Sequence, residues 1–147
     1  MTRKTETRVS AIWGFEAKTR LQVPLYTAGI SAGFPSPADD FIDKRLDLNE
    51  FLIAHPSATF FVRVEGTSMI EAGIHPDDIL IVDKALEPRP GNIVIAVIDG
   101  EFTVKRFQKT RGKSFLLAEN PGFKPIEITE GMRVEIWGVV TYVIHKV

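Results

Sequence analysis

The chain has 147 residues and a mass of 16.4 kDa, which suits one domain of ordinary size with a short extension. Hydrophobic residues make up 44% and charged residues 25%, which excludes a wholly disordered chain, and no apolar run approaches the roughly 20 residues of a membrane-spanning helix. The N-terminus lacks the apolar core of a signal peptide, and the absence of cysteine excludes disulfides and thiol catalysis. We therefore expect a cytoplasmic protein without a membrane anchor.

The charge is almost balanced overall but unevenly distributed. Eighteen basic against 19 acidic residues argue against nucleic-acid binding as the main activity. Residues 1–33 contain five basic and two acidic residues, whereas 34–147 contain 13 basic and 17 acidic residues. We expect a basic, flexible N-terminal arm over 1–33 and an acidic body over 34–147. A merely solvated tail is an equally good interpretation of the composition.

The arm shows little periodicity. No helical or strand pattern is sustained before Leu21, after which Leu21–Tyr26 alternates and predicts a short strand. Pro24 restricts such a strand to the edge of a sheet, because proline has no N–H to donate. Residues 27–37 are rich in glycine, alanine, serine and proline, which predicts an extended, accessible linker.

The body begins with a predicted helix and continues with strands. Asp39 and Asp40 suit the start of a helix that reaches about Ile53 on a ragged apolar face, with a break near Asp47. Asp99-Gly100 predicts a type I′ turn between two strands. The runs that predict strands are Phe60–Val64, Ile79–Val82, Ile93–Ile98, Phe102–Phe107, Phe115–Leu117, Ile126–Ile128 and Val134–Ile144. We expect a mostly β fold, a single compact domain of several short antiparallel strands.

A serine follows the first of these strands. Ser68 lies where the predicted strand gives way to a turn, a position from which a hydroxyl can project into a cleft. Gly66 allows the backbone of a bound peptide to approach closely. Ser68 is therefore a candidate nucleophile, although a turn serine more often hydrogen-bonds its own backbone.

A lysine lies inside a predicted strand. Lys105 shares its side of the strand with Phe107, and a lone strand lysine is usually solvated. In an apolar site, however, an amine gives up its proton more readily. A neutral Lys105 amine could then take the proton of Ser68, which is nucleophile activation without histidine or aspartate. Sequence alone does not bring the two residues together.

Other chemical signals are weak. His55, His75 and His145 lack the spacing of metal ligands, so we expect ordinary surface histidines, no metal site and no cofactor. No GxSxG or phosphate-binding glycine motif is present. Ala32-Gly33 lies in the linker, where an extended small-residue peptide is what a protease groove accepts by strand addition. A simple linker is the alternative interpretation.

These signals occur in an order that resembles the LexA/UmuD family of self-cleaving Ser–Lys peptidases (S24). The resemblance covers about residues 30–147, and the serine-to-lysine spacing of 37 residues fits it. The matching segments are Ala32-Gly33-Phe34-Pro35-Ser36-Pro37, Leu46-Asp47-Leu48-Asn49, His55-Pro56-Ser57-Ala58-Thr59, Gly66-Thr67-Ser68-Met69-Ile70, Asp78-Ile79-Leu80-Ile81-Val82-Asp83, Asp99-Gly100-Glu101-Phe102-Thr103-Val104-Lys105 and Trp137-Gly138-Val139-Val140.

The resemblance implies roles for particular residues. Ser68 is expected to be the nucleophile and Lys105 the general base that later protonates the leaving amine. The bond between Ala32 and Gly33 is expected to be cut. Backbone N–H groups of Ser68 and Thr67 are expected to hold the oxyanion.

The resemblance also implies a cellular role. A RecA filament on single-stranded DNA stimulates cleavage in this family, and the shortened homodimer joins an error-prone, UmuC-like Y-family polymerase for translesion synthesis in the SOS response. We expect no membrane partner and no direct sequence-specific DNA binding. The basic residues 1–29 depart from the usual short arm, and the 30 or so residues before the linker are too few for a winged helix-turn-helix.

Alternative functions stay open. A non-catalytic dimeric adaptor would use the body for binding alone. A LexA-like regulator lacking a DNA-binding domain is disfavoured by the missing winged helix, and a signal peptidase by the missing membrane anchor.

Overall fold

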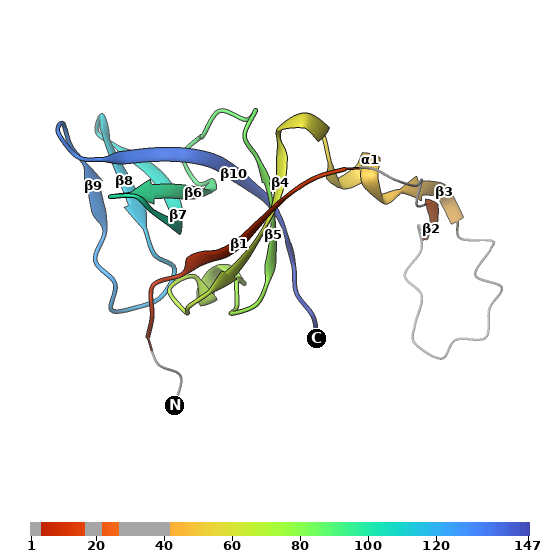
Figure 1. Cartoon of the computed structure of the whole chain (residues 1–147), viewed down its shortest axis with the longest axis horizontal. Helices are drawn as coiled ribbons and strands as arrows, with labels where there is room; N and C mark the ends of the chain where they lie inside the picture. Colours follow the sequence, from red (N-terminus) through yellow and green to blue (C-terminus); the bar gives the residue numbers. More distant parts are fainter. Residues whose placement is uncertain (1–3, 17–21, 27–41) are drawn as a thin grey trace. The chain divides into compact units, whose positions relative to one another are not determined.

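The computed structural model describes residues 4–16, 22–26 and 42–147, with the backbone alone for 22–26 and 42–46 (Figure 1). The chain forms two units. The first comprises Met1–Phe15 and Ser57–Val147, and the second comprises Glu16–Pro56. Among the described residues, no helix combines the length and apolar character needed to cross a membrane.

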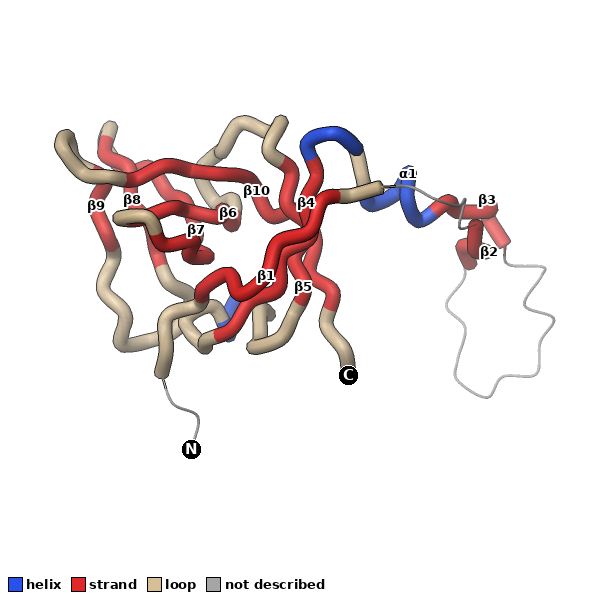
Figure 2. The backbone as a smooth tube through the Cα atoms, viewed as in Figure 1, coloured by secondary structure: helices blue, strands red, loops and turns tan. Residues whose placement is uncertain are grey.

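The first unit is built on an antiparallel sheet in the order β1-β4-β5-β10-β6-β7-β8-β9 (Figures 1 and 2). A further pairing of Arg8 in β1 with Thr103 in β7 closes the first six strands of this order into a ring. The strands are β1 Arg8–Gly14, β4 Thr59–Glu65, β5 Ile79–Asp83, β6 Ile93–Ile98, β7 Glu101–Thr110, β8 Lys113–Leu117, β9 Ile126–Ile128 and β10 Val134–Ile144, and the 3-10 helices are η2 Pro56–Ala58 and η3 Ile70–Ala72. The predicted mostly β fold is confirmed.

The core of this unit follows from strands that are apolar on both faces. Strand β6 places Ile95 in one buried cluster and its neighbours Val94 and Ala96 in another, because successive side chains point to opposite faces. The first cluster contains Val62, Val64, Met69, Ile74, Leu80, Val82, Ile95 and Val104. The second contains Val94, Ala96, Phe107, Leu116 and Val139. The two clusters fix the strands that carry the candidate site.

The sequence predicted the strands from β4 to β10 closely. Strands β6, β9 and β10 have the predicted bounds, and the others differ by one to three residues at their ends. Asp99 and Gly100 have φ values of 49° and 83°. Positive φ at both central residues is what a type I′ turn requires, so the predicted hairpin is confirmed.

Strand β1 was missed. No pattern was found before Leu21, yet Arg8–Gly14 pairs with β4 over most of its length. Arg8, Ser10 and Ile12 are all exposed, so polar and apolar residues share one side of β1. The sequence therefore lacks the regular alternation of polar and apolar residues that predicts a strand. Residues 1–15 therefore group with the body. The predicted boundary at residue 33 lies outside the described residues and stays a prediction.

The second unit corrects the predicted helix. Strand β2 (Gln22–Tyr26) pairs antiparallel with β3 (Ile42–Asp47), so 42–47 is a strand, and the helix α1 is confined to Leu48–Leu52. The Asp47 carboxylate accepts a hydrogen bond from the Asn49 amide at 2.9 Å and caps α1. Pairing with β2, a partner distant in sequence, outweighs the local helical pattern.

One further expectation for the second unit can be compared with the structure, and two others cannot. In a two-stranded sheet β2 is an edge, as Pro24 predicted. The predicted linker 27–37 and the predicted helix start at Asp39 and Asp40 lie outside the described residues.

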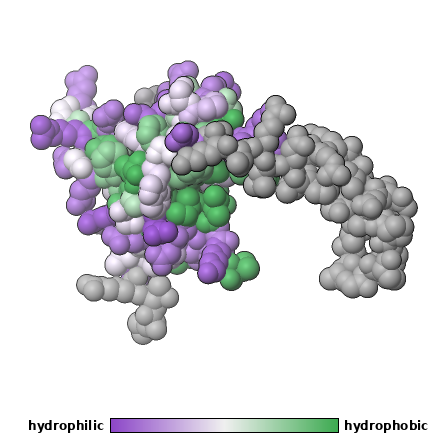
Figure 3. All heavy atoms as spheres, turned by 45° about the vertical axis from the view of Figure 1, so that its right-hand side comes forward, coloured by the Kyte–Doolittle hydropathy of each residue, from purple (hydrophilic) through white to green (hydrophobic). Residues whose placement is uncertain are grey.

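Hydrophobic residues gather on the face of the first unit seen in Figure 3. Large apolar side chains are exposed on β1 and on the end of β10, with exposed fractions between 37% and 49%. These are Ile12, Trp13, Tyr142, Val143 and Ile144. We refer to them as the apolar strand surface.

Candidate active site

Ser68 lies at the exit of β4. The chain leaves the strand at Glu65 and turns at Gly66, whose φ of +96° favours glycine. The turn places Ser68 two residues before the start of η3 and buries it completely. The Ser68 hydroxyl contacts Thr7 and Glu6, which are distant in sequence, whereas the more ordinary expectation was a turn serine that hydrogen-bonds its own backbone.

The loop after β8 holds the turn in place. The Asn120 side-chain amide donates to the carbonyl oxygen of Thr67 at 2.8 Å. The Glu119 amide donates to the carbonyl oxygen of Ser68 at 2.9 Å, and the Glu119 carbonyl accepts from the Glu71 amide at 2.8 Å. The nucleophile candidate is thus fixed from both sides by a second loop. The sequence analysis missed these supporting residues.

Lys105 is buried rather than solvated. It lies in β7 with only 3% of its surface exposed, and its neighbours on the same side of the strand, Thr103 and Phe107, are also buried. Across the sheet it pairs with Val94 of β6. Lys105 was a candidate base only if its side chain lay in an apolar site, and its burial meets the first part of that condition. A buried ammonium also needs a partner, since an unpaired buried charge is very costly.

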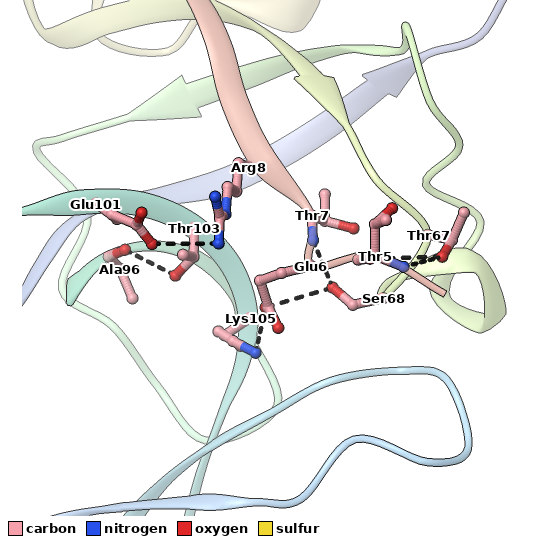
Figure 4. Close-up of polar contacts among 10 residues, drawn as sticks. All are labelled: Thr5, Glu6, Thr7, Arg8, Thr67, Ser68, Ala96, Glu101, Thr103 and Lys105. Carbon is pink, nitrogen blue, oxygen red and sulfur yellow. Dashed lines mark hydrogen bonds and ion pairs between the residues drawn. The ribbon is translucent and has the colours of Figure 1, made fainter. Parts of the chain in front are cut away.

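Glu6 is that partner. Its Oε1 atom forms an ion pair with Lys105 Nζ and lies 3.5 Å from Ser68 Oγ (Figure 4). In the part of the chain that is described, Ser68 and Lys105 make no hydrogen bond to each other. They meet through this one carboxylate oxygen. The structure therefore brings the two predicted residues to one place, with a third residue between them.

An extended segment of the chain, residues 5–7, passes between Ser68 and β7 (Figure 4), and we refer to the place it occupies as the groove. The Thr7 amide donates to Ser68 Oγ at 2.8 Å. The Val104 amide of β7 donates to the Thr7 carbonyl at 3.1 Å. The Thr5 amide donates to Thr67 Oγ1 at 2.9 Å. The groove therefore binds an extended peptide through its backbone N–H and C=O groups.

Gly66 permits this close approach. A Cβ atom at Gly66 would lie 2.2 Å from the Glu6 carbonyl oxygen, so any other residue would displace the segment. The expectation that Gly66 allows a peptide to approach is confirmed. The peptide in question is part of the same chain.

One of the two predicted oxyanion donors makes a backbone hydrogen bond, and its role as an oxyanion donor stays a prediction. The Thr67 backbone N–H donates to the Thr5 carbonyl oxygen at 2.8 Å. A peptide carbonyl is thus already bound by one of the two expected groups, Thr67 and Ser68. The predicted cleavage site, Ala32-Gly33, lies outside the described residues.

Sequence reasoning missed Glu6, Thr5 and Thr7. Their contacts with Thr67 and Ser68 span 61 or 62 residues of sequence, and nothing in the local pattern marks them. His75 and His145, expected to be ordinary surface histidines, lie with their ring centroids 4.9 Å apart.

Comparison with known proteins identifies a family that covers most of the chain. The family described as Peptidase S24-like matches residues 24–141, most of the chain. The chain belongs to the Peptidase S24-like family. The match includes Ser68 and Lys105 and leaves out the segment around Glu6.

Individual S24-like relatives are similar over most of their length. Protein SamA of Salmonella typhimurium is 50% identical over 123 residues, which are 84% of this chain and 85% of SamA. Protein MucA of Escherichia coli is 46% identical over 121 residues, 82% of each chain. LexA repressor 1 of Pseudomonas syringae pv. tomato is 42% identical over 115 residues, 78% of this chain and 56% of the repressor.

Proposed function

We propose that this chain is a self-cleaving serine endopeptidase that cuts its own backbone between Ala32 and Gly33. The observation that carries the proposal is the meeting of the buried Ser68 hydroxyl and the buried Lys105 amine at one carboxylate oxygen. That meeting occurs in a groove that holds an extended peptide. Membership of the S24-like family supports the proposal.

The reaction proceeds in two steps. Neutral Lys105 takes the proton of the Ser68 hydroxyl as Oγ attacks the carbonyl carbon of Ala32. The resulting ammonium returns the proton to the amine of Gly33 as the Ala32–Gly33 bond breaks, leaving an ester between Ser68 and Ala32. Water then attacks the ester, Lys105 accepts its proton, and the Ser68 hydroxyl is regenerated with an Ala32 carboxylate.

The groove supplies orientation and charge stabilisation. Backbone groups of β7 and of the Ser68 turn bind the substrate as a strand and align its carbonyl. The backbone N–H groups of Thr67 and Ser68 receive the negative charge that develops on the Ala32 oxygen. The Thr67 group already binds a peptide carbonyl oxygen, which supports this assignment.

We further propose a role in SOS mutagenesis. Cleavage, stimulated by a RecA filament on single-stranded DNA, yields a homodimer of the shortened chain that acts as an accessory subunit of an error-prone Y-family polymerase. Similarity to SamA and MucA supports the choice of this branch over a repressor. The apolar strand surface provides area for a dimer contact.

A non-catalytic dimeric adaptor is the second candidate. The observation in its favour is the ion pair between Lys105 and Glu6, because a lysine held as an ammonium ion cannot accept the proton of Ser68.

Intact-mass spectrometry separates the two candidates. Purified protein is incubated at neutral and alkaline pH, with and without a RecA filament, beside Ser68→Ala and Lys105→Ala. A wild-type break between Ala32 and Gly33 that is absent from both variants supports the peptidase. No break under any condition supports the adaptor, and a break that persists in Ser68→Ala refutes the assigned nucleophile.

A further inference from the structure

The segment Lys4–Arg8 fills the groove that a substrate must enter. Thr7 is completely buried, and its amide is directed at the Ser68 oxygen (Figure 4). The adjoining residue Val9 packs against the main core cluster. Arg8 forms an ion pair with Glu101 at 3.5 Å, beside the pairing of β1 with β7. The segment is therefore anchored on both sides of the catalytic candidates.

The bound segment is arranged as an inhibitor, not as a substrate. Ser68 Oγ is hydrogen-bonded to the amide nitrogen of Thr7 and to a carboxylate oxygen of Glu6. Neither is an electrophilic carbon, so attack by Oγ leads to no product. The ion pair with Glu6 also requires the ammonium form of Lys105, which cannot act as a base. One segment thus blocks the nucleophile and the base together.

We propose that Lys4–Arg8 is a built-in competitive inhibitor of the Ser68–Lys105 site, held in the groove by the acidic side chain of Glu6 opposite Lys105. This inference rests on the proposed self-cleavage. Residues around Ala32 and Gly33 reach Ser68 only after the segment leaves. Departure of the segment is then the regulated step, and any agent that binds or displaces it accelerates cleavage.

Two cleavage variants test the inhibitor. Glu6→Lys replaces the ion pair with repulsion, so it should raise the self-cleavage rate at neutral pH by about tenfold or more, the usual scale for losing a charged contact. Glu16→Lys makes the same change in charge at an exposed position and serves as the matched control. A Glu6→Lys rate equal to that of Glu16→Lys and of wild type overturns the proposal.

A binding experiment tests the groove without cleavage. A labelled peptide of residues 2–10 is titrated into the full chain carrying Glu6→Lys and Ser68→Ala, and fluorescence anisotropy reports binding. We expect the peptide to bind, and the same peptide with Glu6→Gln to bind about tenfold more weakly. Equal binding of both peptides, or binding of neither, overturns the inhibitor. Absence of cleavage in every variant with normal peptide binding instead refutes the proposed function and leaves the binding groove.

A second, independent feature lies around Asp78. The Asp78 carboxylate is buried, with 2% of its side chain exposed. Its Oδ1 atom lies 2.5 Å from Nδ1 of His145, and its Oδ2 atom accepts a hydrogen bond from the backbone amide of His75 at 2.8 Å. The His75 Nδ1 atom is also buried and has no hydrogen-bond partner among the described residues. It lies 3.8 Å from Asp78 Oδ2. An unsatisfied buried nitrogen beside a buried carboxylate calls for a further partner.

The geometry points to a divalent-cation site formed by His75, Asp78 and His145. One ligand atom from each residue lies within 4.8 Å of the others, and two imidazole nitrogens with a carboxylate oxygen suit zinc. Both imidazole side chains are nearly half exposed, so an ion has access from solvent and a water can complete the coordination. The ion would fasten the residue that follows β10 to the start of β5.

Zinc titration tests this site. Isothermal titration at neutral pH uses the full chain with Ser68→Ala, which keeps it intact, and cobalt(II) absorption reports tetrahedral coordination. We expect one zinc ion per chain. Loss of a residue that only supports a metal ligand lowers metal affinity by about tenfold or more, so His145→Ala or His75→Ala should lower the zinc affinity by at least this factor. His55→Ala is the matched control. No binding, or binding that survives both ligand variants, overturns the site.

Discussion

The ammonium group of Lys105 and the carboxylate of Glu6 form an ion pair in which the lysine is almost entirely buried and the glutamate is about one-quarter exposed. A buried charge with a removable partner is a switchable element. With Glu6 in place the buried charge of Lys105 is compensated, and without Glu6 a buried ammonium would be left unpaired at a high cost in free energy.

The pH dependence of self-cleavage follows from the need for a neutral amine. We expect the wild-type rate to be higher at alkaline than at neutral pH, because only a neutral amine can accept the proton of the Ser68 hydroxyl. Quenched time courses followed by intact mass measure the profile. A rate that does not change over this interval would argue against Lys105 as the base.

Asn120 is expected to act as a positioning residue. Its side chain donates to the Thr67 carbonyl, and Asn120→Ala removes one neutral hydrogen bond worth about 1 kcal/mol, which corresponds to a rate loss of about fivefold. The pH profile should keep its shape, since the base is untouched. Asn92→Ala, a change of the same residue type in a different loop, is the control. A change in the shape of the profile would contradict a purely positioning role.

Gly66→Ala should displace the segment Lys4–Arg8. The added Cβ would meet the Glu6 backbone oxygen, whereas the same change at Gly73, with a φ of +82°, meets nothing within 4 Å. Both variants carry the strain of positive φ, about 1 kcal/mol. Hydrogen exchange followed by mass spectrometry should therefore show lost protection of residues 4–9 in Gly66→Ala alone. Equal protection in the two variants would show that the close contact is not needed.

The apolar strand surface is expected to mediate self-association. Ile144→Asp places a charge at a side chain that is 49% exposed and should shift a dimer toward monomer, measured by light scattering coupled to gel filtration. Met132→Asp changes a side chain that is 38% exposed in a turn outside that surface and serves as the control. An unchanged mass for Ile144→Asp would place the dimer contact elsewhere.

Core packing predicts a large loss of stability at Leu80. This side chain is fully buried in the main cluster, so Leu80→Ala should lower the free energy of unfolding by about 2–5 kcal/mol. Leu86→Ala, at a position that is 38% exposed, should change it by about 0.5 kcal/mol or less. Denaturant unfolding measures both. Similar losses in the two variants would contradict the assigned core.

The strands of the body could be predicted from sequence because each is a short β-branched or aromatic run with a turn signal beside it, as at Asp99-Gly100. The residues 42–47 could not, because their partner strand β2 lies far away in sequence and their own pattern is helical. The same limit explains the site. Ser68 and Lys105 were found as residue types in a suitable order, whereas Glu6 and Asn120 act only through contacts that the fold creates.

The double pairing of β1 has a consequence for what a backbone cut achieves. A break between Ala32 and Gly33 would leave β1 on the smaller fragment, yet its ladder with β4 and its link to β7 would still hold that fragment in place. Cleavage of the Ala32–Gly33 bond and dissociation of the smaller fragment are then two events with separate rates, as in a protein reassembled from two fragments. Only when the smaller piece dissociates does β4 present an open row of N–H and C=O groups, which a strand from another polypeptide can complete.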